Sequence, residues 1–423
     1  MRTAEVIAVG SELLGMNRTD TNSLYISQRL SEIGVDVRVK TIVGDERRDL
    51  ASVFRQALER VDVVVLTGGL GPTDDDLTRE VVADVLDLPI SIDETIVEKI
   101  RARFERRGLT MPEVNRRQAQ VPRGAMVLDN PNGTAPGLYI EHAGVHGPQA
   151  ILLMPGPPRE MHPMLDRVCA GPLAALAGSE RTYRTSLFLT GRGESHIEQL
   201  VQPIYSRWRD RTPPISTTIL AAMGQIELHL SLRDTDEARA RATLARAKDE
   251  LVSVVGDYVY STDGRPMEEV VGELLKARGY SVAAAESCTG GLFSSRLTDV
   301  PGSSAYVRGG IVAYANEDKV SLLGVAADVI AAHGAVSEPV AVAMAEGIRE
   351  RTGVDVSVGI TGIAGPGGGT PQKPVGTVAI AVIVPGQPVY VRTFQFIGGR
   401  AMVKFQATQA AMDRIRRMLT AHH

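Results

Sequence analysis

Apolar runs alternate with amphipathic segments along the first part of the chain. Residues 6–9 and 63–66 are continuously apolar and predict buried strands, whereas residues 21–33 and 50–60 carry apolar side chains at helical spacing. Strands that alternate with helices are typical of a parallel sheet that helices cover on both faces. We therefore predict a three-layer α/β/α domain over residues 1–170.

The pattern of the next segment, residues 171–260, is different. Its predicted elements follow the order strand, helix, strand, strand, helix, strand, at residues 182–189, 195–208, 216–220, 225–232, 235–254 and 258–260. This order is typical of a small α+β module. Turn-forming residues at 261–266 then predict a linker, and residues 264–423 are assigned to a third domain, again of the α/β class.

Length and composition fit a protein of two to three domains. The chain has 423 residues, of which 43% are hydrophobic, and a net charge of −4; domains usually have ~100–200 residues. The negative charge argues against a general binder of nucleic acid or of a membrane surface. Two cysteines, Cys169 and Cys288, cannot build a disulfide framework and favour a reducing compartment. The chain shows no signal-peptide core and no apolar run of the ~18 residues that a membrane-spanning helix needs, so we expect a cytoplasmic protein.

Residues 284–291, with the sequence AAESCTGG, are the most informative stretch for chemistry. They place the hydroxyl of Ser287 and the thiol of Cys288 where an apolar segment meets a predicted helix. Unpaired backbone N–H groups and the positive end of the helix dipole favour developing negative charge at such a position. Either side chain is therefore a candidate nucleophile. The alternative is that Ser287 is an ordinary N-cap and Cys288 a small buried residue.

A serine nucleophile needs a base, and Lys319 is the candidate. No histidine lies between His229 and His333, whereas a buried neutral lysine can accept the proton of a serine hydroxyl. Because Glu317 and Asp318 precede it directly, this hypothesis requires Lys319 to point inward and both acidic side chains outward. On spacing alone, a solvent-exposed helical lysine remains the alternative.

Two glycine-rich segments further along are typical of anion-binding sites. Residues 359–369 (GITGIAGPGGG) follow directly on a predicted buried strand, and Gly398 and Gly399 precede Arg400 at a later helix start. Glycines let backbone N–H groups approach a phosphate or an oxyanion closely, and Arg400 can add a bidentate charged contact. The alternative for the first segment is a mobile surface turn.

Taken together, residues 264–420 resemble the C-terminal domain of the CinA family, the nicotinamide mononucleotide (NMN) deamidases. The resemblance rests on six segments, at residues 285–291, 302–305, 314–316, 333–337, 362–366 and 373–377. It implies that Ser287 is the nucleophile on the nicotinamide amide and that Lys319 is the base that activates it. The products would be nicotinic acid mononucleotide and ammonia, released through an acyl-enzyme that needs no metal or other cofactor.

The same resemblance implies further site residues in this domain. They are Ser304 and Tyr314 in support of catalysis, Thr361 and Gly362 near the oxyanion, Gly290 and Gly291 beside the substrate, and Arg400 on the 5′-phosphate.

The N-terminal domain has a glycine loop of its own at residues 66–78 (LTGGLGPTDDDLT), in which Gly68, Gly69 and Gly71 allow a phosphate to approach the backbone closely. The three aspartates that follow, Asp74, Asp75 and Asp76, would either cap the next helix or bind a hard divalent cation, which prefers carboxylate oxygens. Glu12 follows the first predicted strand and is expected at the same edge of the sheet.

Residues 1–168 resemble the molybdopterin-binding-like N-terminal domain of CinA proteins, through these loops and through residues 132–137 and 154–161. In that family the domain goes with an ADP-ribose pyrophosphatase activity that depends on a divalent metal (Mg²⁺, Mn²⁺ or Co²⁺) and yields AMP and ribose 5-phosphate. The site residues that we assign on this basis are Asp74, Asp75, Asp76 and Glu12 for the metal, and Asn132, Thr134 and Arg159 for the substrate.

The leading hypothesis is therefore a CinA-like hydrolase that acts on NMN in its C-terminal domain and on ADP-ribose in its N-terminal domain. We expect small-molecule nucleotides as partners, with no nucleic acid and no membrane, and the resemblance implies a homodimer. Two alternatives remain open: a non-catalytic adaptor in competence or the DNA damage response, and a molybdopterin-binding protein. An intact set of Ser287, Tyr314, Lys319 and Arg400 favours an enzyme, since an adaptor has no need of it.

Overall fold

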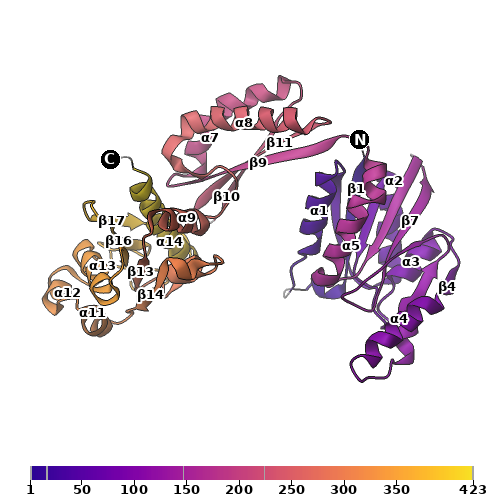
Figure 1. Cartoon of the computed structure of the whole chain (residues 1–423), viewed down its shortest axis with the longest axis horizontal. Helices are drawn as coiled ribbons and strands as arrows, with labels where there is room; N and C mark the ends of the chain where they lie inside the picture. Colours follow the sequence, from indigo (N-terminus) through magenta and orange to yellow (C-terminus); the bar gives the residue numbers. More distant parts are fainter. Residues whose placement is uncertain (1, 16–17, 146, 223, 422–423) are drawn as a thin grey trace. The chain divides into compact units, whose positions relative to one another are not determined.

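The computed structural model of the chain describes residues 2–15, 18–145, 147–222 and 224–421. The chain divides into two compact units, which are described separately (Figure 1). The first comprises residues up to 183 together with residues 233–240, and the second comprises residues 184–232 and 241–423.

The first unit is built on a six-stranded sheet with the order β2-β1-β3-β8-β7-β6. Its strands are β1 (Thr3–Val9), β2 (Asp36–Val43), β3 (Val63–Thr67), β6 (Met126–Leu128), β7 (Gly137–Gly144) and β8 (Gly147–Met154). The first four strands of the sheet are parallel, as predicted. The prediction of a parallel sheet is wrong for β7 and β6, because β7 and β8 follow one another as a hairpin, which can only pair antiparallel.

Helices cover both faces of this sheet, which confirms the three-layer class (Figure 1). On one face α1 (Asn22–Glu32) and α5 (Pro158–Ala170) bury Ile26, Leu30 and Met161 against the strands. On the other face α2 (Arg47–Arg60) and α3 (Thr78–Val85) bury Phe54 and Val82. The other elements of this part of the chain are η1 (Ser11–Leu13), β4 (Ile90–Ile92), α4 (Glu94–Glu105), η2 (Glu113–Ala119), β5 (Gln120–Pro122) and α6 (Pro172–Ala177).

The middle segment has the predicted order of strand, helix, strand, strand, helix, strand. Its strands form a separate four-stranded sheet in the order β10-β11-β9-β12, with β10 antiparallel to β11 and β12 antiparallel to β9. The elements are β9 (Arg181–Thr190), α7 (Glu194–Tyr205), η3 (Ser206–Asp210), β10 (Ser216–Ala222), β11 (Gln225–Asp234), α8 (Glu237–Val255), η4 (Gly256–Tyr258) and β12 (Val259–Ser261).

The C-terminal domain has a five-stranded sheet in the order β14-β13-β15-β16-β17. Its strands are β13 (Val282–Glu286), β14 (Val307–Val312), β15 (Val356–Gly362), β16 (Thr377–Ile383) and β17 (Tyr390–Gln395). Because β13 and β15 are parallel neighbours, the turns that follow them emerge at the same edge of the sheet.

Helices cover both faces of the C-terminal sheet as well. On one face lie α9 (Met267–Arg278), α10 (Leu292–Thr298) and α14 (Arg400–Thr420). On the other lie α11 (Asn316–Leu323), α12 (Ala327–His333) and α13 (Glu338–Thr352), and η5 (Ser303–Ala305) precedes β14. In the described part of the chain, no helix combines the length and the apolar character that crossing a membrane requires.

Candidate functional sites

Ser287 lies in the turn that joins β13 to α10. Its backbone N–H donates to the carbonyl oxygen of Ile360 on β15 at 2.9 Å, so the turn is tied to the neighbouring strand, and the residue is 6% exposed. Gly290 and Gly291 close the turn with φ values of 60° and 89°, a region that residues with a side chain rarely adopt. These two glycines shape the turn and do not line the cavity beside Ser287.

The start of the helix differs from the prediction, because α10 begins only at Leu292. Ser287 is therefore not its N-cap. The N-cap is Gly291, and the buried carboxylate of Glu286 caps the helix in its place, since it accepts hydrogen bonds at 3.0 Å from the backbone N–H groups of Phe293 and Ser294. The positive end of α10 is thus occupied by Glu286, and its dipole is not free to stabilise an anion at Ser287 or Cys288.

Lys319 comes from α11 and points inward at Ser287. Its Nζ lies 3.1 Å from the Ser287 Oγ and 3.2 Å from the carbonyl oxygens of Ala313 and Tyr314, and the residue is only 2% exposed. Glu317 is exposed and Asp318 is half-buried, and among the described residues neither forms an ion pair with Lys319, so the inward direction that the hypothesis requires is present for the lysine. Burial lowers the pKa of Lys319 below its usual value, which favours the neutral amine that a general base requires.

Cys288 is the rival nucleophile, and its surroundings disfavour that role. Burial raises the pKa of its thiol to about 12, so almost none of it is thiolate near neutral pH. Physical chemistry thus favours Ser287, a choice that the residues alone had left open.

A cavity of about 260 Å³ opens beside the Ser287–Lys319 pair. Tyr314, Thr361, Gly362 and Arg400, all predicted site residues, line it together with Cys288, Asn316 and the glycine segment 365–368. The Arg400 guanidinium donates to the Gly365 carbonyl oxygen and to the Tyr314 hydroxyl, each at 2.9 Å. Both partners are neutral, so the positive charge of Arg400 stays available to an anion in the cavity.

Thr361 lines the cavity as predicted, but its hydroxyl proton is already used. Its hydroxyl donates to the carbonyl oxygen of Ala335 at 2.8 Å and has no second proton to offer an oxyanion. Lys373 holds the same segment, because its Nζ donates to the carbonyl oxygens of His333 and Val336 at 2.9 and 2.7 Å. Neither Glu286 nor Lys373 had been assigned a role from the sequence; the signal available was their position within the matching motifs.

The prediction for Ser304 is wrong as to position. Ser304 lies in η5, just before β14, and the first residue of β14, Val307, pairs with Val282 at the start of β13. Ser287 follows the last residue of β13, so the two serines lie at opposite ends of the strands. Ser304 does not line the cavity.

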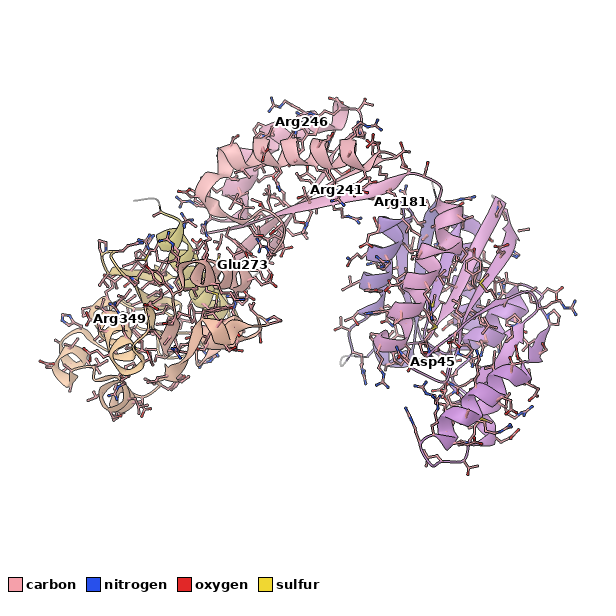
Figure 2. The ribbon with its side chains drawn as sticks, in the orientation of Figure 1. Asp45, Arg181, Arg241, Arg246, Glu273 and Arg349 are labelled. Atoms are coloured by element: carbon pink, nitrogen blue, oxygen red, sulfur yellow. The ribbon has the colours of Figure 1, made fainter. Side chains whose placement is uncertain are left out.

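A second cavity, of about 790 Å³, lies in the first unit at the carboxyl ends of β1 and β3. Gly68, Gly69 and Gly71 line it, as does Glu12. An added Cβ at Gly68 would lie 2.1 Å from the Val9 carbonyl oxygen, so only glycine allows this approach of the two strand ends. Asp45 (labelled in Figure 2) also lines the cavity, and its side chain accepts from the Ser11 N–H at 2.7 Å.

The three aspartates of this loop are not gathered as predicted. None of them caps α3, which begins at Thr78 without a side-chain cap. Asp76 instead closes the loop on itself, accepting from the N–H groups of Gly71 and Thr73 at 2.7 and 2.9 Å, and the fully exposed Asp74 lies 3.3 Å from Arg117.

Among the described residues, no group of three or more His, Cys, Asp or Glu side chains is placed to hold a metal ion. Of the four predicted metal residues, Glu12, Asp75 and Asp76 line the cavity and Asp74 does not. Asp76 is already bound by backbone N–H groups, which leaves Asp75 and Glu12 as the better candidates, and the metal site stays a prediction.

Of the predicted substrate residues in this domain, Thr134 lines the cavity and Asn132 and Arg159 do not. The Asn132 side chain donates to the Arg159 carbonyl oxygen at 2.8 Å, so this pair secures a loop. Asn22 was missed from the sequence. It is 9% exposed and lines the cavity; its Nδ2 donates to Thr67 Oγ1 and the Gly156 carbonyl oxygen, and its Oδ1 has no partner among the described residues.

The fold and the two cavities define a multidomain α/β protein with a buried serine–lysine pair in its C-terminal domain. Residues 264–419 match the family model described as "CinA C-terminal domain", residues 184–261 match "Damage-inducible protein CinA KH domain", and residues 5–175 match "Probable molybdopterin binding domain". The chain belongs to the CinA family.

Relatives match over nearly their whole length. A "CinA-like protein" of Koribacter versatilis (strain Ellin345) is 45% identical over 98% of this chain and 99% of its own, and one of Acidobacterium capsulatum is 44% identical over the same shares. A solved structure of the competence/damage inducible protein CihA from Agrobacterium tumefaciens is 35% identical, with a TM-score of 0.36, and covers 37% of this chain and 94% of its own. The resemblance inferred from the sequence motifs is thereby confirmed at the level of the family.

Proposed function

We propose that the C-terminal domain hydrolyses the amide of NMN to nicotinic acid mononucleotide and ammonia. The observation that carries this proposal is the buried pair itself: Lys319 Nζ lies 3.1 Å from Ser287 Oγ at the wall of a ligand-sized cavity. A buried lysine that forms no ion pair with a carboxylate among the described residues, and instead contacts a serine hydroxyl, is typical of an activated nucleophile.

The reaction follows from these two groups. Neutral Lys319 accepts the Ser287 proton while Oγ attacks the amide carbon, which gives a tetrahedral oxyanion. The C–N bond then breaks, and the ammonium of Lys319 returns its proton to the departing nitrogen, so that ammonia leaves and an ester on Ser287 remains. A water molecule that Lys319 deprotonates attacks this ester, and the acid is released as Ser287 recovers its proton.

Arg400 supports a phosphorylated substrate. Its guanidinium lines the same cavity and is held by neutral oxygens of Gly365 and Tyr314, so it can pair with a phosphate without first breaking an ion pair. The cavity volume of about 260 Å³ is near the lower limit of ~300 Å³ usual for small-molecule sites, which suits a mononucleotide better than a dinucleotide.

The test is ammonia release from NMN by the full chain without added metal, compared with the single variants Ser287→Ala, Lys319→Ala and Cys288→Ala. We expect the first two to lose roughly 10²-fold or more of the rate, whereas Cys288→Ala keeps most of it. Absence of ammonia with the wild-type protein would leave the adaptor hypothesis as the better account of this domain.

We also propose that the N-terminal cavity binds and hydrolyses ADP-ribose to AMP and ribose 5-phosphate. Two observations support this proposal. The glycine loop with Gly68 brings backbone close to the cavity, and Asn22 Oδ1 is a buried acceptor without a partner among the described residues, which a hydroxyl or amino group of a nucleotide would satisfy. Asp75 and Glu12 would share a divalent cation with the substrate, as Mg²⁺ sites with one or two carboxylates commonly do. The cation would neutralise charge on the diphosphate.

Asp75→Asn and Asp74→Asn form a matched pair for this second activity, since Asp75 lines the cavity and the exposed Asp74 does not. AMP formation from ADP-ribose with Mg²⁺, Mn²⁺ or Co²⁺ should fall in Asp75→Asn and persist in Asp74→Asn. Tight pterin binding without AMP formation would instead favour the molybdopterin-binding alternative. We propose a cytoplasmic homodimer for the whole protein; a sedimentation run that shows only monomer would remove the dimer.

A further inference from the structure

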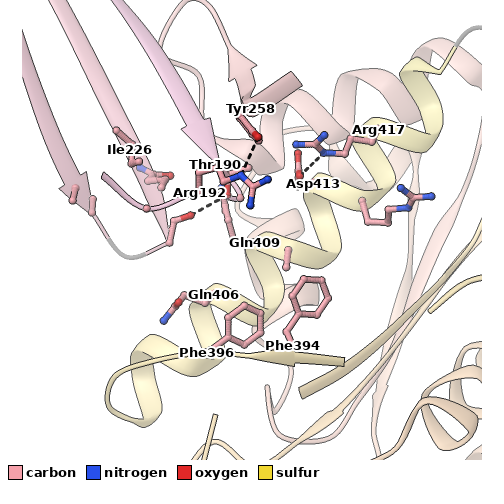
Figure 3. Close-up of a pocket in the computed structure, with 18 of the residues that line it drawn as sticks. Thr190, Arg192, Ile226, Tyr258, Phe394, Phe396, Gln406, Gln409, Asp413 and Arg417 are labelled. Carbon is pink, nitrogen blue, oxygen red and sulfur yellow. Dashed lines mark hydrogen bonds and ion pairs between the residues drawn. The ribbon is translucent and has the colours of Figure 1, made fainter. Parts of the chain in front are cut away.

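A cavity of about 820 Å³ in the second unit, where the middle module meets β17 and α14, is not explained by the proposed reactions (Figure 3). Its walls are the loop 190–194, the hairpin residues 221, 222 and 224–226, the aromatic residues at 390, 394 and 396, and one face of α14 between Gln406 and Arg417. It shares no lining residue with the Ser287 cavity. It is therefore a separate site, and the proposed amidase reaction makes no use of it.

Three arginines line this cavity without a carboxylate partner among the described residues: Arg192, Arg392 and Arg414. Each is held over an aromatic ring instead. The guanidinium carbon lies 5.2 Å from the Tyr258 ring centre for Arg192, 5.0 Å from Phe394 for Arg392, and 4.0 Å from Tyr390 for Arg414. An aromatic face positions a cation and does not neutralise it, so these charges stay available to an anion.

The acidic groups of the cavity do not balance this charge. Asp413 is 8% exposed and forms ion pairs at 2.7 Å with both Arg416 and Arg417, so its negative charge is already neutralised. Figure 3 shows the pair with Arg417. Glu194 is the other carboxylate among the lining residues and lies on the exposed first turn of α7. The cavity therefore has an excess of positive charge within a chain whose net charge is −4.

One buried donor along the cavity, the Arg414 Nε, also lacks an acceptor within the described residues. A buried donor left unpaired costs roughly 1–3 kcal/mol. A ligand with acceptor oxygens would remove that cost.

The opposite wall of the cavity is aromatic. Phe394 on β17 and Phe396, just after the end of that strand, stack with ring centres 5.4 Å apart and planes 5° from parallel (Figure 3). Because Arg392 and Arg414 lie over the rings of Phe394 and Tyr390, Phe396 offers the remaining apolar ring surface to a planar ring. The lining residues include no cysteine, histidine, lysine or serine, so this wall provides binding surface and no nucleophile–base pair.

From the unpaired arginines and the aromatic wall we propose that this cavity is a second ligand site, which binds an anionic nucleotide. The phosphate lies among Arg192, Arg392 and Arg414, and the base stacks on Phe396. The site belongs to neither proposed hydrolytic reaction.

The experiment uses AMP as the probe, titrated into the full chain, with hydrogen–deuterium exchange to locate it. We expect AMP to lower exchange at residues 190–194 and 390–396. Arg392→Gln and Arg414→Gln should each weaken this effect by roughly tenfold or more, since each removes a charged hydrogen-bond donor. Arg392 lies on an exposed position of the edge strand β17, so its variant tests the site without risk to the core.

Arg400→Gln is the matched control: it removes an arginine from the Ser287 cavity and should leave protection at residues 190–194 and 390–396 intact. Inorganic phosphate, the second probe, should protect these segments more weakly than AMP because it lacks a base. The proposal fails if AMP protects neither segment, if both arginine variants bind AMP like wild type, or if phosphate protects as well as AMP at the same concentration.

Discussion

Replacement of Lys319 by arginine tests whether Lys319 is a general base or only a positive charge that stabilises the turn. Lys319 Nζ lies within hydrogen-bond distance of Ser287 Oγ and of two carbonyl oxygens, at a position that is 2% exposed. Arginine keeps a positive charge and several donors at this place, but its guanidinium does not lose a proton in proteins. If Lys319 only held the turn together, Lys319→Arg would keep most of the activity. If it is the base, the variant is inactive although it is folded.

The expected loss follows from what the base contributes. General-base catalysis is worth about 10²–10⁴-fold, or about 3–5 kcal/mol of activation free energy. Lys319→Met is the second variant of this test, because methionine has a similar length and no hydrogen-bond donor. It leaves the carbonyl oxygens of Ala313 and Tyr314 unpaired, at about 1–3 kcal/mol each, partly offset because a buried amine is removed. Both variants should therefore lose at least about 10²-fold in kcat, while the KM for NMN changes little.

The mechanism also predicts the direction in which kcat/KM changes with pH. The reactive form of Lys319 is neutral, so kcat/KM rises with pH through the pKa of this group. Burial lowers that pKa, so the midpoint of the rise should lie below the usual value of 10.5. The variants lack the titrating amine, so the ascending limb should disappear from their residual activity.

The assay is ammonia release from NMN, followed from pH 6 to 10, with urea unfolding as a check that each variant is folded. Lys319→Arg also enlarges a buried side chain, at about 1–3 kcal/mol, which the unfolding curve would register. A folded Lys319→Arg protein that keeps more than about a tenth of the wild-type rate would refute the base assignment. So would an unchanged ascending limb in Lys319→Met.

Four further outcomes are expected. Arg400→Gln should raise the KM for NMN by roughly tenfold or more and leave the hydrolysis of nicotinamide riboside, which has no phosphate, nearly unchanged; equal losses on both substrates would contradict phosphate recognition. Thr361→Val should cost about 1 kcal/mol of stability and affect KM more than kcat, whereas an oxyanion donor would lose about 10²–10³-fold in kcat. Glu286→Gln should lower the urea midpoint by the equivalent of about 1–3 kcal/mol, because it weakens the cap of α10; an unchanged midpoint would show that the cap is dispensable. Ser304→Ala should turn over NMN like wild type, and a large loss would mean that the far end of β14 takes part in the reaction.

The sequence by itself determined the local elements and the family. Apolar runs such as residues 63–66 had no alternative to a buried strand, and the order of elements in the middle module followed from period and turn residues alone. The pairing direction of β7 was not available, because a hairpin and a crossover can carry the same apolar pattern.

The chemistry of the candidate site depended on long-range contacts. Ser287 and Lys319 are 32 residues apart, and only the packing of α11 against the turn after β13 shows that their side chains meet. Tertiary structure also favours Ser287 over Cys288 as the candidate nucleophile, since the thiol is buried where its ionisation is unfavourable.

Residues that are neighbours in the sequence do not always share a site, as a loop that folds back on itself shows. Asp74, Asp75 and Asp76 are consecutive, yet Asp74 pairs with Arg117 outside the cavity, whereas Asp75 and Asp76 line it and Asp76 is bound by its own loop. Ser304 belongs to a matching motif but lies at the other end of the strands from Ser287. Hydrophobic period is a local property that the chain carries in its own order, whereas the direction and partner of a polar side chain are set by residues far away in that order. For this reason the sequence alone could predict the layers of this protein, and only the tertiary structure could show which polar groups share a site.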